Sequence, residues 1–120
     1  MAEDLLRKVE VDWLLSIYGA MLTDKQREIA TLYYEEDYSL AEIAQQEGVS
    51  RQSVHDTLQR VEKQLRTWED KLNMRRRLTN VQMELEKAMA ALEENHCPAA
   101  KAAIGTALNL LTDEEDANGL

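Results

Sequence analysis

Ser39 to Val61 reads Ser-Leu-Ala-Glu-Ile-Ala-Gln-Gln-Glu-Gly-Val-Ser-Arg-Gln-Ser-Val-His-Asp-Thr-Leu-Gln-Arg-Val, and this stretch decides the fold. Ser39 and Glu42 have the spacing of a capping box, so we expect a short helix to begin directly after Ser39. Gly48 follows two turns later, where the chain must leave the helix with a positive φ that glycine adopts at little cost. Ser50 is then placed to cap a second helix. The stretch therefore predicts a helix-turn-helix.

The apolar residues of this stretch fit two helices that cross closely. Ile43 and Ala44 are expected to face inward, and Ala44 is small enough for a close crossing. Val49 is expected to pack into the corner of the turn. The buried positions of the second helix follow at i, i+4 and i+7, and they are Val54, Leu58 and Val61. A helical hairpin with a solvated polar face is the alternative, but three independent signals favour the helix-turn-helix.

Length and composition favour one helical domain. A chain of 120 residues can bury one modest core but not two independent ones. It has 44% hydrophobic and 31% charged residues with a single proline, which suits helices better than sheets. No apolar run has the length of a membrane span, and the N-terminal Met-Ala-Glu-Asp lacks a basic signal region. We therefore expect a cytoplasmic protein with no membrane partner.

Two further helices are predicted before the motif. In residues 4–22 the expected apolar stripe is Leu5, Val9, Trp13, Ile17 and Met21, widened by Leu6, Leu14 and Tyr18. The two aromatic residues could stack on bases, but aromatic residues beside leucines at helical spacing are more typical of a core. Thr23 and Gln26 form a second capping box. The helix that they begin has Ile29, Leu32 and Tyr33 on its buried side, and the acidic residues 35–37 belong to a solvated turn.

The apolar spacing continues after the motif. The second helix of the motif is expected to extend through Leu65, Trp68 and Leu72. Beyond the arginines at 75–77, a seam follows with the spacing of a helical hairpin or coiled coil, formed by Leu78, Val81, Leu85, Ala88 and Leu92. Pro98 suits the first position of a last helix, whose apolar residues are Ile104, Leu108 and Leu111.

These patterns predict an all-α fold with five or six helices. Residues 1–72 are the helix-turn-helix domain, with a three-helix core of the winged-helix or homeodomain type. Residues 73–112 are a C-terminal helical extension packed as part of one globular unit, and residues 113–120 are a disordered tail. The expected core consists of Trp13, Ile17, Ile29, Leu32, Ile43, Val54 and Leu58. This core leaves the C-terminal seam uncovered, so we expect a homodimer. The alternative is a monomer whose C-terminal hairpin folds back onto Trp68 and Leu72.

No enzyme activity is expected. His55 and Asp56 are adjacent on a helix and point in different directions, so they cannot act as a base and its orienter. Cys97 and the two histidines lack metal-ligand spacing, and no glycine-rich phosphate loop is present. We predict no metal, no cofactor and no small-molecule substrate.

The predicted second helix of the motif suits nucleic acid. Arg51 and Gln52 occupy the N-terminal positions that commonly enter the major groove, where arginine suits guanine and glutamine suits adenine. Arg51, Arg60 and Lys63 are candidates for phosphate contacts. The formal net charge of −9 opposes long-range attraction to phosphates, although residues 49–66 are locally basic. A basic protein partner meeting the acidic surface is the alternative.

The N-terminal half resembles a known family. It resembles the YlxM family of small bacterial helix-turn-helix proteins and the promoter-reading fourth region of sigma factors. The resemblance is carried by residues 22–28, 32–34, 37–44 and 49–54. The resemblance is strong over residues 12–72. It implies a cytoplasmic protein encoded beside the genes of the signal recognition particle GTPases, with a regulatory part in that pathway.

The resemblance and the motif give one set of candidate binding residues, and Lys63 is added as a phosphate contact. The nucleic-acid-binding candidates are Arg51, Gln52, Ser53, His55, Gln59, Arg60 and Lys63. An aromatic residue is expected in the family at the position of His55. The predicted function is a nucleic-acid-binding regulator whose ligand is DNA or the RNA of the signal recognition particle. The alternative is an adaptor that binds the particle's protein without reading DNA.

Overall fold

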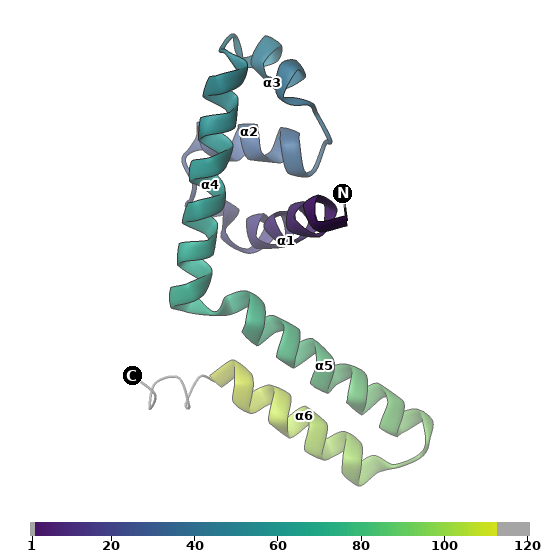
Figure 1. The fold of residues 1–120 in the computed structure, drawn as a ribbon. Coiled ribbons are helices and arrows are strands. Elements are labelled where there is room, and N and C mark those ends of the chain that lie inside the picture. The colour runs from purple at the N-terminus through teal and green to yellow at the C-terminus, as the bar shows by residue number, and fades with distance from the viewer. Residues whose placement is uncertain (1, 113–120) are drawn as a thin grey trace. The chain divides into compact units, whose positions relative to one another are not determined.

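The computed structural model describes residues 2–112 of the chain, and these residues form helices without any strand (Figure 1). The elements are α1 (Ala2–Tyr18), the 3₁₀ helix η1 (Gly19–Met21), α2 (Asp24–Tyr34), α3 (Leu40–Glu47), α4 (Arg51–Leu72), α5 (Met74–Glu93) and α6 (Cys97–Thr112). The all-α fold class is confirmed. The chain divides into two compact units, with the boundary between residues 73 and 74.

The helix-turn-helix is formed by α3 and α4 in the first unit. Ser39 Oγ accepts the backbone N–H of Glu42, and the Glu42 carboxylate accepts the N–H of Ser39, so the predicted capping box is confirmed. Gly48 ends α3 with φ 69° and ψ 34°, the left-handed conformation expected there. Ser50 Oγ then accepts the N–H of Ser53 and caps α4. Gly48 and the Ser50 cap therefore fix the turn, and the Ser39 cap fixes the start of α3.

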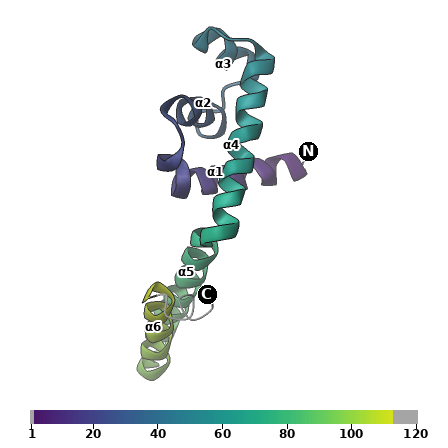
Figure 2. The same ribbon diagram turned by 90° about the vertical axis from the view of Figure 1, so that its left-hand side faces the viewer.

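The core of the first unit lies along α4, against which α1, α2 and α3 all pack (Figure 2). The predicted buried positions Val54, Leu58 and Val61 are buried, as are Ile43 and Ala44 of α3. Val49 was expected in the corner of the turn, but this residue is 38% exposed. Its backbone N–H donates to the carbonyl of Ala44, so the main chain of Val49 closes the turn while the residue is only partly covered.

The predicted buried stripe of α1 is confirmed for Leu14 and Tyr18, which were expected at its side, but its central line is wrong. The buried residues are Val11, Leu14, Leu15 and Tyr18, whereas Leu5, Val9, Trp13 and Met21 are exposed and Ile17 is half-buried. Steps of four residues advance by about 40° beyond a full turn, so a stripe made only of such steps winds around the helix and cannot face one partner. Met21 also lies in η1 and not in α1. Trp13 is therefore not part of the core, contrary to the prediction. Leu32, which was also expected in the core, is only half-buried.

Polar contacts attach α1 to α4. Glu62 accepts from Arg7 at 3.0 Å and from Arg66 at 3.2 Å, and Arg66 also pairs with Glu10. Close to the end of α1, Tyr18 Oη donates to Glu69 at 2.7 Å in a partly buried position. Arg7 and Glu10 thus connect the first half of α1 to the middle of α4, and Tyr18 connects the end of α1 to the later turns of α4.

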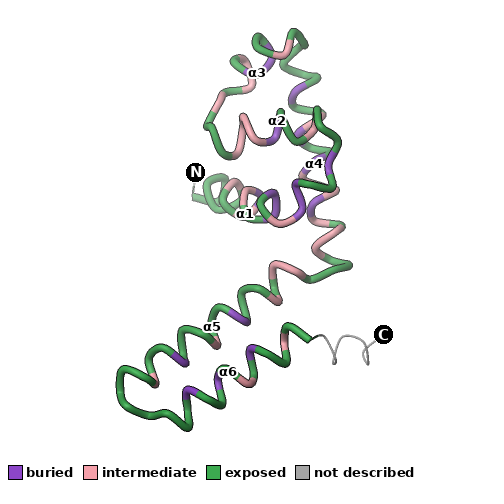
Figure 3. The backbone as a smooth tube through the Cα atoms, turned by 180° about the vertical axis from the view of Figure 1, so that it is seen from behind, coloured by how far each residue is buried: buried purple, intermediate pink, exposed green. Residues whose placement is uncertain are grey.

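The second unit is a hairpin of α5 and α6 that packs through small residues. Its buried cluster contains Ala88, Ala100 and Ala103, with Ala91 packed against it. Buried positions lie on the sides of α5 and α6 that face each other, and most other positions are exposed (Figure 3). Val81 and Ala88 of the predicted seam are buried. The remaining residues of the seam and the apolar residues predicted for the last helix are exposed, namely Leu78, Leu85, Leu92, Ile104, Leu108 and Leu111.

The ends of these two helices differ slightly from the prediction. The last helix begins at Cys97, one residue before Pro98. His96 Nδ1 accepts the N–H of Ala99 at 3.2 Å and therefore caps α6. Asn73 and Asn95 adopt positive φ values of 54° and 59° after α4 and α5. The predicted tail, residues 113–120, lies outside the described residues, and packing of the two units into one globular body stays a prediction.

Candidate nucleic-acid interface

The first turn of α4 carries three of the candidate residues, Arg51, Gln52 and Ser53, and all three are exposed. The turn through Gly48 and the Ser50 cap hold the start of the helix, so these side chains project from a fixed end. The hydroxyl of Ser53 is on this surface, while its backbone N–H is used by the cap. The structure therefore brings these three candidates together at the end of α4 beside α3.

One row of candidates runs along the side of α4 opposite the core. Gln52, Gln59 and Lys63 lie on this row at helical spacing, and Asp56 lies between them. All four side chains are exposed. Gln52 Nε2 donates to Asp56 Oδ1 at 2.9 Å. The row therefore combines two amides and one cation with a carboxylate that holds one of the amides.

His55 and Gln59 border a cavity of about 470 Å³ between the helices of the first unit. Tyr33 and Tyr34 line the same cavity, with their ring centroids 4.9 Å apart in an edge-to-face arrangement. Lys8 Nζ lies 4.4 Å from the centroid of the Tyr33 ring. Burial, followed by the nearby carboxylate of residue 62, raises the pKa of Tyr34 to about 12. His55 thus lies toward α1 and apart from the row that Gln52 begins.

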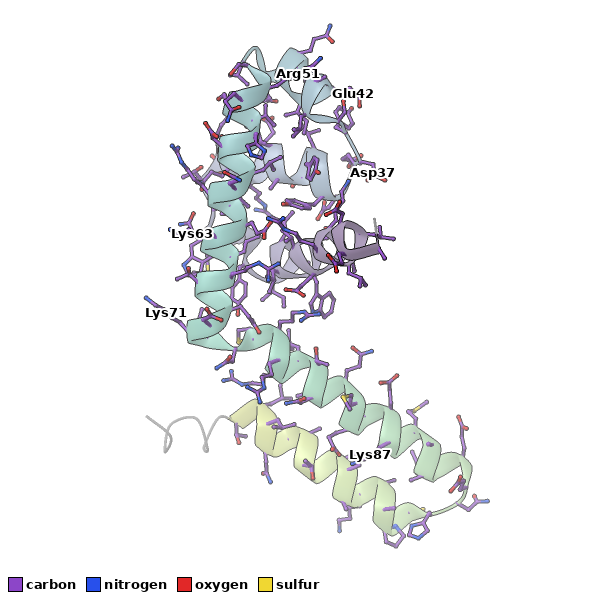
Figure 4. All side chains as sticks on the ribbon, viewed as in Figure 1. Asp37, Glu42, Arg51, Lys63, Lys71 and Lys87 are labelled. Carbon is purple, nitrogen blue, oxygen red and sulfur yellow. The ribbon has the colours of Figure 1, made fainter. Side chains whose placement is uncertain are left out.

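Three candidate cations are available to an anionic ligand. Within the part of the chain that the structure describes, the side chains of Arg51, Arg60 and Lys63 form no ion pair. Figure 4 places Arg51 at the first turn of α4 and Lys63 near the middle of the helix, on the side away from α1 and α2. Arg66 belongs to the same locally basic segment, but Glu10 and Glu62 already bind it. Arg51 and Arg60 are nine residues apart and therefore project from opposite sides of α4, so the three cations are spread around the helix and do not form one face.

An ion pair between α2 and the last turn of α3 stabilises the helix end that precedes the turn. Lys25 Nζ of α2 lies 2.6 Å from Glu47 Oε1 in the last turn of α3, and the Glu47 side chain is only 6% exposed. The hydrogen bond from Lys25 lowers the pKa of Glu47. The backbone hydrogen bond from Ser39 likewise lowers the pKa of Glu42. Both carboxylates of α3 are thus ionised and occupied by internal partners at neutral pH.

The sequence reasoning missed two of these features. The contact between Gln52 and Asp56 follows an i, i+4 spacing that could have revealed it. The pair of Lys25 and Glu47 joins residues far apart in the sequence, so no local pattern marks it.

Residues 2–112 contain no cluster of three or more histidine, cysteine or carboxylate side chains suited to a metal ion. Among these residues, no helix is both long enough and apolar enough to cross a bilayer.

Comparison with known proteins agrees with this architecture. Residues 5–102 match the UPF0122 family, described as "Putative helix-turn-helix protein, YlxM / p13 like". A UPF0122 protein of Clostridium botulinum is 38% identical over 89 residues, which cover 74% of this chain and 82% of that protein. A UPF0122 protein of Thermoanaerobacter sp. is 46% identical over 80 residues, which cover 67% of this chain and 68% of that protein.

A UPF0122 protein of Streptococcus agalactiae is 56% identical over 61 residues, which cover 51% of this chain and 56% of that protein. No solved structure gives a significant match. The family match extends over most of both compact units, and the helix-turn-helix in its description is the motif formed by α3 and α4. The chain belongs to the UPF0122 family of YlxM- and p13-like proteins.

Proposed function

We propose that this protein is a nucleic-acid-binding regulator that uses α4 to contact a duplex, with no catalytic activity of its own. The observation that carries the proposal is the set of three cations, Arg51, Arg60 and Lys63, exposed on one helix whose start is fixed by a tight turn. Guanidinium and ammonium groups suit phosphate oxygens. Arg51 and Gln52 at the N-terminal end also offer hydrogen bonds that suit base edges.

The proposal divides the candidate residues by role. Arg51 and Gln52 are the base contacts, and Arg60 and Lys63 extend the contact along the phosphate backbone. Ser53 is placed for a hydroxyl contact at the same end of the helix. His55 borders the cavity, and Gln59 lies between the cavity and the row of Gln52 and Lys63, so we place both at the edge of the interface. A homodimer would present two such helices to one duplex.

The biological setting follows from the family resemblance. We propose a cytoplasmic regulator in the signal recognition particle pathway whose ligand is either DNA or the particle's RNA. The second candidate function is an adaptor that binds the particle's protein. The formal net charge of −9 and the carboxylate of Asp56 within the row on α4 favour this second candidate, because both repel phosphate.

A capture experiment separates the two candidates. The tagged full-length protein and its Arg51→Ala/Gln52→Ala variant are incubated with bacterial lysate, the bound nucleic acid is sequenced, and the bound protein is identified. A regulator should enrich a defined DNA or RNA, and the variant should lose it. Equal recovery of a protein of the particle by both forms, without nucleic acid, would support the adaptor and contradict the regulator.

A further inference from the structure

The hairpin of α5 and α6 has one apolar face that its own packing leaves uncovered. Seven large apolar side chains of the hairpin are 37% to 62% exposed, and they are Leu78, Leu85, Met89, Leu92, Ile104, Leu108 and Leu111. The contact between the helices uses mainly alanines, which bring the two backbones close together but bury little apolar surface. The larger side chains therefore lie beside the contact and not within it.

Helical geometry places these side chains on the same face of the hairpin. On α5, Leu85 is rotated by about 40° from buried Val81 and by about 60° from buried Ala88, counting 100° for each residue. On α6, Ile104 is rotated from buried Ala100 and Ala107 by similar angles in the same sense. The two helices are antiparallel, as Figure 1 shows, so equal rotations lead to the same side of the hairpin.

The opposite face of the hairpin is polar. On α5 it carries Asn80, Glu84 and Lys87, of which Lys87 pairs with Glu84 at 3.1 Å. Thr106 lies on this side of α6. One side of the hairpin is therefore mainly polar and the other mainly apolar, with Gln82 among the apolar residues of α5. Contiguous apolar surface of this kind is typical of a protein contact.

The spacing of the apolar residues on α5 is compatible with an identical partner. Leu78 and Leu92 lie seven residues on either side of Leu85. If two copies of α5 pack antiparallel about a two-fold axis at Leu85, Leu78 of each copy lies beside Leu92 of the other. The same axis brings the two copies of Leu85 together.

Charges at the edge of the face fit the same axis. Arg75 and Glu93 are eighteen residues apart, which equals five full turns, so both lie on one line along the outer edge of the apolar face. They lie ten and eight residues from Leu85, on opposite sides. The antiparallel arrangement therefore brings Arg75 of one copy close to Glu93 of the other at both ends. The same axis also places Glu86 of the two copies near each other on this edge, so the apolar spacing and not the charge selects the register.

We propose that the apolar face of α5 and α6 binds the same face of a second copy of this chain, with α5 antiparallel to α5 about Leu85. The contact joins four helices into a bundle in which the two charged pairs border an apolar centre. This inference is independent of the proposed nucleic-acid binding, because no candidate residue of α4 takes part.

Mass measurement tests the proposal first. Light scattering on the unmodified protein at micromolar concentration should give twice the chain mass of 13.8 kDa. Leu85→Glu should raise the dissociation constant about a hundredfold or more, because two carboxylates would be buried together at the axis. Met83→Glu is the matched control: this methionine is 59% exposed on the same helix but lies away from the apolar face, so the variant should remain dimeric.

Two further variants test the register. With Cys97 replaced by serine, Leu85→Cys should form a disulfide between two copies under mild oxidation, and Met83→Cys should not. Arg75→Glu should weaken the dimer, and the double variant Arg75→Glu/Glu93→Arg should restore it. Circular dichroism shows whether each variant remains helical, and Leu108→Glu replaces Leu85→Glu if the latter unfolds. A mass near 13.8 kDa for the unmodified protein, or a disulfide at residue 83 but not at residue 85, would overturn the proposal.

Discussion

Gln52 Nε2 donates a hydrogen bond to Asp56 Oδ1 at 2.9 Å, one turn along the exposed side of α4. The contact holds the amide of Gln52 at the end of the helix that is proposed to read bases. It also places a carboxylate within the row of side chains that would face phosphates. Asp56 therefore orients a binding residue and at the same time weakens the attraction of the surface for nucleic acid.

Replacing Asp56 by asparagine should strengthen binding to a nonspecific duplex about two- to fivefold at low salt, because one repulsive charge near the phosphates is removed. Fluorescence anisotropy with a labelled duplex measures the effect. Asp70→Asn is the matched control, since it changes the net charge equally on the same helix but near its other end. Equal gains in the two variants would show that Asp56 has no special position.

The double variant Arg51→Ala/Gln52→Ala should lose about 1 to 3 kcal/mol of binding free energy for each base contact removed. Its thermal unfolding should be unchanged, because both side chains are exposed. Lys71→Ala removes a cation from the last turn of the same helix and should bind normally. Unaltered affinity in the double variant would rule out groove reading by this end of α4.

The capping carboxylate of Glu42 should make the stability of the protein depend on pH. The hydrogen bond from the backbone of Ser39 lowers the pKa of Glu42 below its ordinary value of 4.5 in the folded state. The contribution of this carboxylate is therefore complete above the ordinary value and is lost as the pH falls through the lowered folded value.

Glu42→Gln keeps an acceptor for Ser39 but does not titrate. We expect the unmodified protein to exceed this variant in free energy of unfolding at pH 7, and the difference to shrink as the pH falls below about 4. Urea unfolding at several pH values measures the difference. A difference that stays constant across this range would exclude the capping carboxylate as the titrating group.

The buried side of α1 can be tested by two substitutions. Leu14 is 2% exposed, so Leu14→Ala should lower the free energy of unfolding by about 2 to 5 kcal/mol. Val9 is 60% exposed, and Val9→Ala should change the stability by less than about 0.5 kcal/mol. Chemical denaturation compares the two variants. A larger loss of unfolding free energy for Val9→Ala than for Leu14→Ala would support the buried stripe that was expected from the sequence.

Local patterns predicted the helix-turn-helix because its determinants are short in range. The capping box of Ser39 and Glu42, the left-handed glycine at Gly48 and the cap at Ser50 each involve residues within three or four positions. The buried positions of α4 were also predicted, because Val54, Leu58 and Val61 repeat along a single helix that has one buried side. The exposure of the seven candidate binding residues follows from the same repeat.

The sequence could not reveal contacts that depend on which helices meet. Three partners pack against α4, so the buried side of α1 is set by its angle to α4 and not by the number of its leucines. The hairpin of α5 and α6 meets through alanines such as Ala88 and Ala100, although leucines were the stronger signal. Arg66 is basic in the sequence, yet carboxylates of α1 and α4 bind it in the fold.

The salt dependence of nucleic-acid binding tests the central claim most directly. Association constants of the full-length protein with the duplex or RNA recovered from lysate, measured by anisotropy between 50 and 300 mM salt, should fall with a log–log slope on the order of −3 if Arg51, Arg60 and Lys63 contact phosphates. Lys63→Ala should reduce the magnitude of the slope by about 1. A slope near zero, or one that Lys63→Ala leaves unchanged, would contradict the assignment of α4 as the nucleic-acid-binding helix.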